Sequence, residues 1–351
     1  MDKQKLFFEQ LILTVLTPVN FLLSLLIVFH HAFTVEVDYR GSFAFGAYSI
    51  DVAFQRFMYN LSECAVPVFF FISAFLFYRT FDGTWGKYKE KMRRRVRSLF
   101  IPYILFCTLG YIKALMFNGG IENGNFYDYI VSIWESNTMP LWFIRELMAL
   151  SILAPFCWRL IKCPWLAFIL CSLIFVLIAF GIVPYRSFVY WIPVYLLGAS
   201  CNRPIWNKVI FLMQNHIVKV ISIIIIVAYV ISAWYLPNGI SKEQMTWLQN
   251  GIFAIFRYFT PVVFICVMWW MIVGRVKGRS FMQYSFFVYC LHAPVIALVR
   301  LIYEKLHLNS MLPETMKYLI IVFFVYFICV LVAMILQKHS PSVWKILNGG
   351  R

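Results

Sequence analysis

The sequence has few charged residues. Asp, Glu, Lys and Arg make up 13% of the 351 residues and hydrophobic residues 62%, against roughly a quarter and half in soluble domains. So few charges could not cover that much apolar surface in water, so lipid must cover it. The net charge of +16 does not indicate nucleic acid, because the basic residues lie in short loops where membrane topology and anionic headgroups explain them.

Several motifs are also missing. The nine cysteines lie inside or at the ends of apolar runs without a CxxC pair, which argues against a disulfide framework or a zinc site. No HExxH or carboxylate-rich pattern accompanies the adjacent histidines 30 and 31, so we expect no metal and no permanently bound cofactor. No GxSxG segment occurs, which argues against a serine nucleophile on a sharp elbow.

What the sequence does have is apolar runs of membrane-spanning length. They predict an all-α, polytopic transmembrane bundle of about ten spans, forming a single domain over residues 1–351. Residues 1–16 are expected to form an interfacial helix ending at Thr17–Pro18, since Pro suits the first turn of a new helix and Thr can cap it. Residues 338–351 are expected to form a short cytoplasmic tail. The runs are 18–35, 64–81, 99–117, 140–158, 164–183, 188–201, 217–236, 247–273, 280–302 and 318–337.

Lys and Arg are concentrated in alternate loops. The N-terminus, residues 79–97, the 203–219 stretch, the 275–279 loop and the tail hold most of them. Positively charged loops stay in the cytoplasm, so both termini are predicted to be cytoplasmic.

Six ionisable side chains lie inside apolar runs, where charge is costly and indicates function. Their positions along separate runs predict that they converge on one zone, from the middle to the outer half of the membrane. Simpler interpretations stay open: a lone His can hydrogen-bond between helices, and one of an adjacent Arg–Glu pair can reach the membrane surface. Arg257 is harder to dismiss, since a mid-span Arg needs a carboxylate, a phosphate or a water-filled cavity. The six are His30, His31, Arg145, Glu146, Arg257 and His292.

These groups suit acyl transfer to a hydroxyl. A His of near-neutral pKa can take the proton from an attacking alcohol and return it to the leaving group. A carboxylate can fix the His tautomer, and Arg can hold phosphates or a developing oxyanion.

Motifs along most of the chain carry a family likeness. The opening segment is 20–31 (NFLLSLLIVFHH), and four segments follow: 66–76 (VPVFFFISAFL), 94–103 (RRVRSLFIPY), 140–147 (PLWFIREL) and 284–294 (YSFFVYCLHAP). Together they resemble the bacterial integral-membrane acyltransferase family 3, whose members O-acylate lipopolysaccharide, peptidoglycan, exopolysaccharide and related glycans.

Two positions depart from the family pattern. The family has Arg eleven residues before its catalytic His, where this chain has Asn20 ahead of His31, and Ala74 replaces the Gly of SGFL. One hypothesis is that Arg257, or the pair Arg94 and Arg97, replaces the missing charge.

The resemblance implies a cytoplasmic acyl-CoA donor, expected to be acetyl-CoA, and a glycan or lipid-linked sugar acceptor, in the bacterial cytoplasmic membrane. Arg94 and Arg97 would contact the CoA phosphates, unless they only set topology. His31 would be the general base, with His30 the alternative.

The remaining candidate residues follow from the same resemblance. Glu146 would orient the base or the acceptor, and Trp142 and Tyr289 could stack on a sugar. Arg145 and His292 are further candidates for substrate binding. Two other functions stay open: a transporter or flippase of a lipid-linked glycan, which would also bury charge in a cavity, and a catalytically impaired glycan-binding relative.

Overall fold

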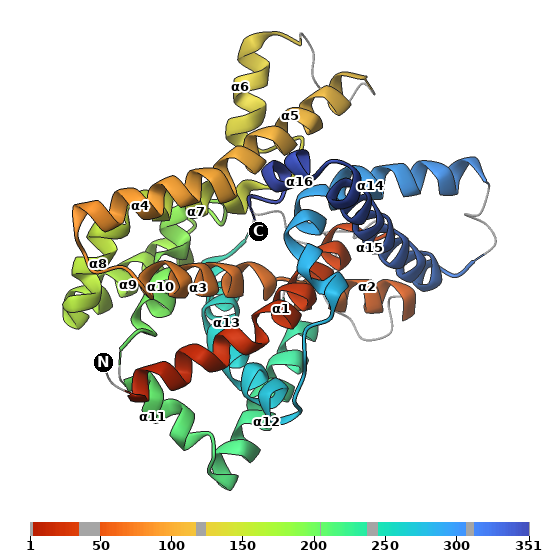
Figure 1. The fold of residues 1–351 in the computed structure, drawn as a ribbon. Coiled ribbons are helices and arrows are strands. Elements are labelled where there is room, and N and C mark those ends of the chain that lie inside the picture. Colours follow the sequence, from red (N-terminus) through yellow and green to blue (C-terminus); the bar gives the residue numbers. More distant parts are fainter. Residues whose placement is uncertain are drawn as a thin grey trace.

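The computed structural model of the protein describes residues 3–34, 50–116, 124–203, 205–236, 245–306 and 312–350. These residues form helices and no strand, as the apolar runs predict (Figure 1). The helices are α1 (Lys3–His31), α2 (Ile50–Ser62), α3 (Ala65–Tyr78), α4 (Trp85–Arg95), the π-helix η1 (Val96–Phe100), α5 (Ile101–Met116), α6 (Phe126–Glu135), α7 (Trp142–Ile152), α8 (Ala154–Lys162), α9 (Pro164–Ala179), α10 (Phe188–Ser200), α11 (Ile205–Leu212), α12 (His216–Trp234), α13 (Trp247–Val273), the 3₁₀-helix η2 (Ser280–Tyr284), α14 (Ser285–Lys305), α15 (Glu314–His339) and α16 (Pro341–Leu347).

Within the described residues, seven helical segments are long and apolar enough to cross a membrane, or eight if a pair bent by 117° counts as one span. The multi-pass architecture is therefore confirmed, while the count of ten and the cytoplasmic termini stay predictions. The seven segments are Phe8–His31, Ile50–Tyr78, Trp85–Met116, His216–Trp234, Trp247–Val273, Ser280–Lys305 and Glu314–His339.

The middle of the chain differs most from the predicted runs. Run 140–158 is divided between α7 and α8, which meet at Leu153, because Pro155 in the first turn of α8 cannot continue the preceding helix. The bent pair is α8 with α9. Run 188–201 forms α10, which has only 13 residues. Neither run forms a full-length span by itself.

The boundary predicted at Thr17–Pro18 is wrong, because α1 continues through Pro18. Proline removes one backbone hydrogen bond, but membrane helices tolerate this where neighbouring segments pack around the site. Here the 274–279 loop does so: a Cβ at Gly278 would lie 3.1 Å from the Thr17 side chain. The interfacial placement of residues 1–16 stays a prediction.

The tail after Gln337 folds back onto the bundle. Within it, α16 packs on α15 and α5, and Trp344 is buried against Tyr284 and Phe287. The tail is therefore docked against α5, η2 and α14.

The centre of the bundle is built around α3, which is apolar on all sides and buried along most of its length. It packs closely against α10, where Gly198 allows the approach: a Cβ there would lie 2.2 Å from the Phe71 carbonyl oxygen. Small residues permit such contacts between membrane helices. Around this centre, α1, α3 and α13 pack on one another, and α14 packs on α1. Figure 1 shows α5 and α6 extending away from the body.

Candidate active site

A small cavity of about 120 Å³ lies where the ends of several helices meet. The C-terminal end of α1, the turn between α2 and α3, the first turn of α7, and helices α13 and α14 all contribute. We call it the histidine cavity. Its lining residues are Ile27, His30, His31, Tyr59, Ser62, Glu63, Val66, Pro140, Trp142, Phe143, Tyr185, Arg186, Arg257 and Tyr289. The structure thus brings together five of the predicted site residues: His30, His31, Trp142, Arg257 and Tyr289.

The two adjacent histidines have different surroundings. His30 Nδ1 lies 2.8 Å from Ser62 Oγ, and its ring stacks on Tyr59 at 4.2 Å between ring centroids. The His31 side chain has no hydrogen bond to any residue in the described ranges, although its ring lines the cavity. His31 is therefore the imidazole whose nitrogens are open to a substrate.

His292 lies behind His31. Their ring centroids are 5.1 Å apart, and His292 is fully buried. Its Nδ1 lies 2.7 Å from the Tyr289 carbonyl oxygen, an acceptor that fixes Nδ1 as the donor. His292 does not line the cavity, and its predicted contact with the substrate stays a prediction. Its ring packs on that of His31.

Arg257 is paired with a carboxylate that the sequence analysis missed. Its Nε donates to Glu63 Oε2 at 2.9 Å and its Nη1 to the Tyr190 hydroxyl at 3.0 Å. Both charges are nearly buried. The signal was available, because a mid-span Arg needs a partner and Glu63 directly precedes the run that begins at residue 64.

Tyr185 closes the cavity from the loop before α10, outside the membrane-spanning segments. The Arg257 guanidinium lies 4.1 Å from its ring centroid, an attraction typical of cation–π contacts. Burial, reinforced by the negative charge of Glu63, raises the pKa of Tyr185 well above its ordinary value. Its phenol therefore stays protonated and can act as a donor.

Arg145 and Glu146 lie outside the lining of the histidine cavity. Arg145 Nε donates to Glu146 Oε1 at 2.6 Å, and its guanidinium also donates to the backbone carbonyls of Trp134 and Arg186. The Glu146 carboxylate is therefore paired with its neighbour, and its expected role in orienting the base or the acceptor stays a prediction. Glu63 is the carboxylate of this cavity.

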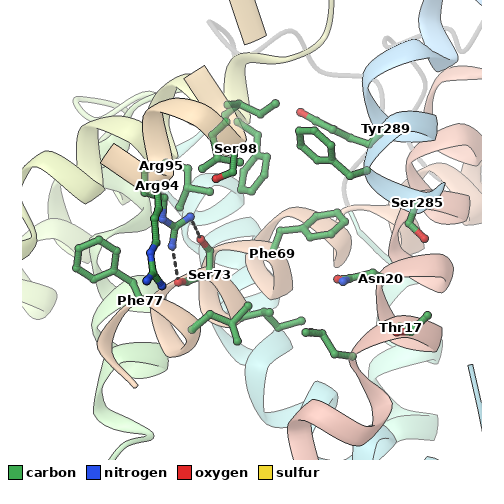
Figure 2. Close-up of a pocket in the computed structure, with 18 of the residues that line it drawn as sticks. Thr17, Asn20, Phe69, Ser73, Phe77, Arg94, Arg95, Ser98, Ser285 and Tyr289 are labelled. Carbon is green, nitrogen blue, oxygen red and sulfur yellow. Dashed lines mark hydrogen bonds between the residues drawn. The ribbon is translucent and has the colours of Figure 1, made fainter. Parts of the chain in front are cut away.

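A second cavity, of about 560 Å³, lies between α3, α4, α7, α14 and α1 (Figure 2). We call it the basic cavity, because its lining includes Arg79, Lys91, Arg94 and Arg95 and no acidic residue. Its other lining residues are Leu16, Thr17, Asn20, Phe69, Ile72, Ser73, Leu76, Phe77, Thr80, Ser98, Leu99, Phe143, Ile144, Leu147, Met282, Gln283, Ser285, Phe286 and Tyr289.

Arg94 and Arg97 were expected to contact the donor, but Arg94 and Arg95 are the arginines of residues 93–97 that line the basic cavity. Arg95 reaches into the cavity and donates to Ser73 Oγ at 2.6 Å and to the Ser73 carbonyl at 2.8 Å (Figure 2). Arg94 lines the cavity but is largely exposed and paired with Glu90. Arg97 is exposed and absent from the lining, because its position in η1 turns it outward.

Asn20 lies on the wall of the basic cavity, across from Arg94 and Arg95 (Figure 2). Arg257 is paired in the other cavity, so it does not occupy the place of the arginine that the family pattern has here. Arg95, together with Lys91, puts positive charge into the space that Asn20 faces.

Trp142 and Tyr289, the two residues expected to stack on a sugar, differ in which cavities they line. Trp142 packs against Tyr185, with 4.9 Å between ring centroids, on the wall of the histidine cavity. Tyr289 lines both cavities. The two cavities are therefore neighbours that share part of one wall.

A family model described as an acyltransferase domain matches residues 21–336. No similar curated protein and no similar solved structure was found. The match covers most of the residues that line both cavities, and the chain belongs to acyltransferase family 3.

Proposed function

We propose that the protein transfers a short acyl group, expected to be acetyl, from acyl-CoA to a hydroxyl of a glycan or lipid-linked sugar. The main support is the position of His31. It lines a small cavity that shares part of its wall with a larger cavity, and four cationic side chains line that larger cavity. One cavity suits the base and the acceptor hydroxyl, and the other suits the donor.

The basic cavity supports an anionic donor. Its volume lies within the roughly 300–1,000 Å³ of typical small-molecule sites. Guanidinium groups form strong, charge-assisted hydrogen bonds with phosphates. Arg95 and Lys91 are the cations positioned for this, with Arg94 at the exposed edge. Because the basic segment is predicted to be cytoplasmic, the donor would come from that side.

In the histidine cavity, His31 would accept the proton of the attacking hydroxyl while the hydroxyl oxygen bonds to the thioester carbonyl carbon. The carbon–sulfur bond then breaks and the imidazolium returns its proton to the CoA thiolate. The products are an ester and free CoA thiol. Arg257 and the Tyr185 hydroxyl line the same cavity and would stabilise the negative charge that develops on the carbonyl oxygen.

The test uses purified protein in lipid nanodiscs with radiolabelled acetyl-CoA. Octyl β-D-glucoside serves as a minimal membrane-soluble sugar, and polyprenyl-linked glycans serve as fuller acceptors. We expect label to move to the sugar. His31→Ala should lower kcat by about 10²- to 10⁴-fold, the usual contribution of a general base, and His30→Ala should lower it less.

A matched control is His339→Ala at the exposed end of α15, which should transfer label like the wild-type protein. Equal rates for wild type and His31→Ala would refute the proposed base. A protein that uses no donor with any acceptor, but moves a lipid-linked glycan across vesicles, would be a flippase instead.

A further inference from the structure

The wall between the two cavities is aromatic. Phe143 from α7 and Tyr289 from α14 line both the basic cavity and the histidine cavity. Their ring centroids are 6.0 Å apart in an edge-to-face arrangement, and Phe143 is 7% exposed and Tyr289 5%. These two rings are the part of the wall that both cavities share.

A third ring supports them from the basic side. Phe69 of α3 lies 5.6 Å from Phe143 and 6.2 Å from Tyr289, centroid to centroid. We call these three residues the aromatic partition. Figure 2 shows Tyr289 and Phe69 projecting into the basic cavity from opposite helices. Tyr289 lies one turn before His292 on α14, and its carbonyl oxygen accepts the His292 hydrogen bond.

The two cavities differ greatly in size. The basic cavity holds about 560 Å³ and the histidine cavity about 120 Å³, below the roughly 300 Å³ at which sites for drug-sized ligands begin. His31 lies on the small side. The thioester carbonyl must therefore reach the small cavity, while the bulk of a large donor stays in the basic one.

On this basis we propose that the aromatic partition selects the acyl group by length, admitting two- and three-carbon acyl groups and rejecting longer ones. The inference rests on the proposed acyl transfer and adds the substrate class. Beyond the third carbon, each further methylene must displace or press against a buried ring. In apolar pockets one methylene changes the specificity constant by about 10- to 200-fold.

The test measures kcat/KM for CoA thiol release from acetyl-, propionyl-, butyryl- and hexanoyl-CoA, with octyl β-D-glucoside as acceptor. The wild-type protein should prefer acetyl- over butyryl-CoA by at least about 10-fold. Phe143→Ala opens the partition and should reduce this preference about 10-fold or more. Phe143→Leu is a milder variant for the case in which the alanine variant does not fold, and it should shift the preference in the same direction.

Two controls separate the ring from other effects. Tyr289→Phe keeps the ring and loses only the hydroxyl, so it should keep the acyl-length preference. Phe323→Ala removes a ring on the outer surface of α15, where Phe323 is 65% exposed, and should behave like wild type.

A wild-type protein that uses acetyl- and hexanoyl-CoA equally would overturn the inference. An unchanged preference in an active Phe143 variant would do the same, while the proposed function would stand. Absence of CoA release with every donor would overturn both.

Discussion

The histidine cavity and the basic cavity differ in how their charges are balanced. In the histidine cavity, the buried Arg257 is paired with Glu63, and Arg186 adds a second cation to the lining. The basic cavity has four cations and no acidic residue in its lining. Two of these cations reach acidic residues outside the lining, Arg79 with Glu9 and Arg94 with Glu90.

The difference indicates what each cavity can accept. Where a carboxylate already pairs the buried arginine, no charge on the ligand is needed to balance it, whereas an excess of cations without acids favours an anionic ligand. A neutral hydroxyl and a small acyl group suit the first cavity, and a phosphate-bearing donor suits the second. The aromatic partition separates these two environments at the point where donor and acceptor would meet.

The largest change should follow from removing one charge of the buried pair. Arg257→Ala leaves Glu63 buried without its cation, and breaking a buried pair costs about 3–5 kcal/mol. We expect a clearly lower midpoint of thermal unfolding in detergent, together with loss of transfer. The control is the double variant Glu63→Gln with Arg257→Gln, which removes both charges and should regain most of the midpoint. If both proteins melt alike, the pair does not balance the charge of this cavity.

A smaller effect should distinguish the cations of the basic cavity. Arg95→Ala removes a guanidinium aimed into the cavity, and hydrogen bonds to charged groups contribute about 1.5–3 kcal/mol. The KM for acetyl-CoA should therefore rise about 10- to 100-fold with little change in kcat. Arg97→Ala is the matched control, because Arg97 is exposed outside the lining, and its KM should stay within about twofold of wild type. A larger effect from Arg97 than from Arg95 would contradict the position of the donor.

The smallest effect should come from adding charge. Asn20→Arg places a fifth cation on the wall of the basic cavity. Exposed ion pairs contribute about 0.2–1 kcal/mol, so the KM for acetyl-CoA should fall by up to about fivefold at low ionic strength. Salt screens such pairs, and the gain should disappear near 1 M salt. A rise in KM would show that Asn20 contacts the donor as an amide.

Much of the architecture could be predicted from the sequence, because burial in lipid imposes long apolar helices that composition reveals directly. Pro18 and Pro155 show the limit of this approach. The first is tolerated inside α1 and the second divides a run into α7 and α8. Whether a proline breaks a helix depends on the neighbours that pack around it, which the local sequence does not contain.

The candidate site could be predicted in part. Ionisable groups are costly in lipid, and for that reason the sequence analysis selected His31 and Arg257. Both line the histidine cavity. The partner of Arg257 was missed, since Glu63 lies 194 residues away in sequence. Glu146 looked equally suitable, but it pairs with Arg145 and does not line the histidine cavity.

By itself, the sequence determined that this chain is an all-helical, multi-pass membrane protein with acyltransferase-family motifs and polar side chains inside its spans. Those properties depend on composition and local order. The tertiary structure decided which polar groups share a cavity, that Arg95 rather than Arg97 faces the basic cavity, and that Phe143 and Tyr289 separate the two spaces. Such contacts depend on how helices far apart in the chain pack together, and a helical period alone does not encode that packing.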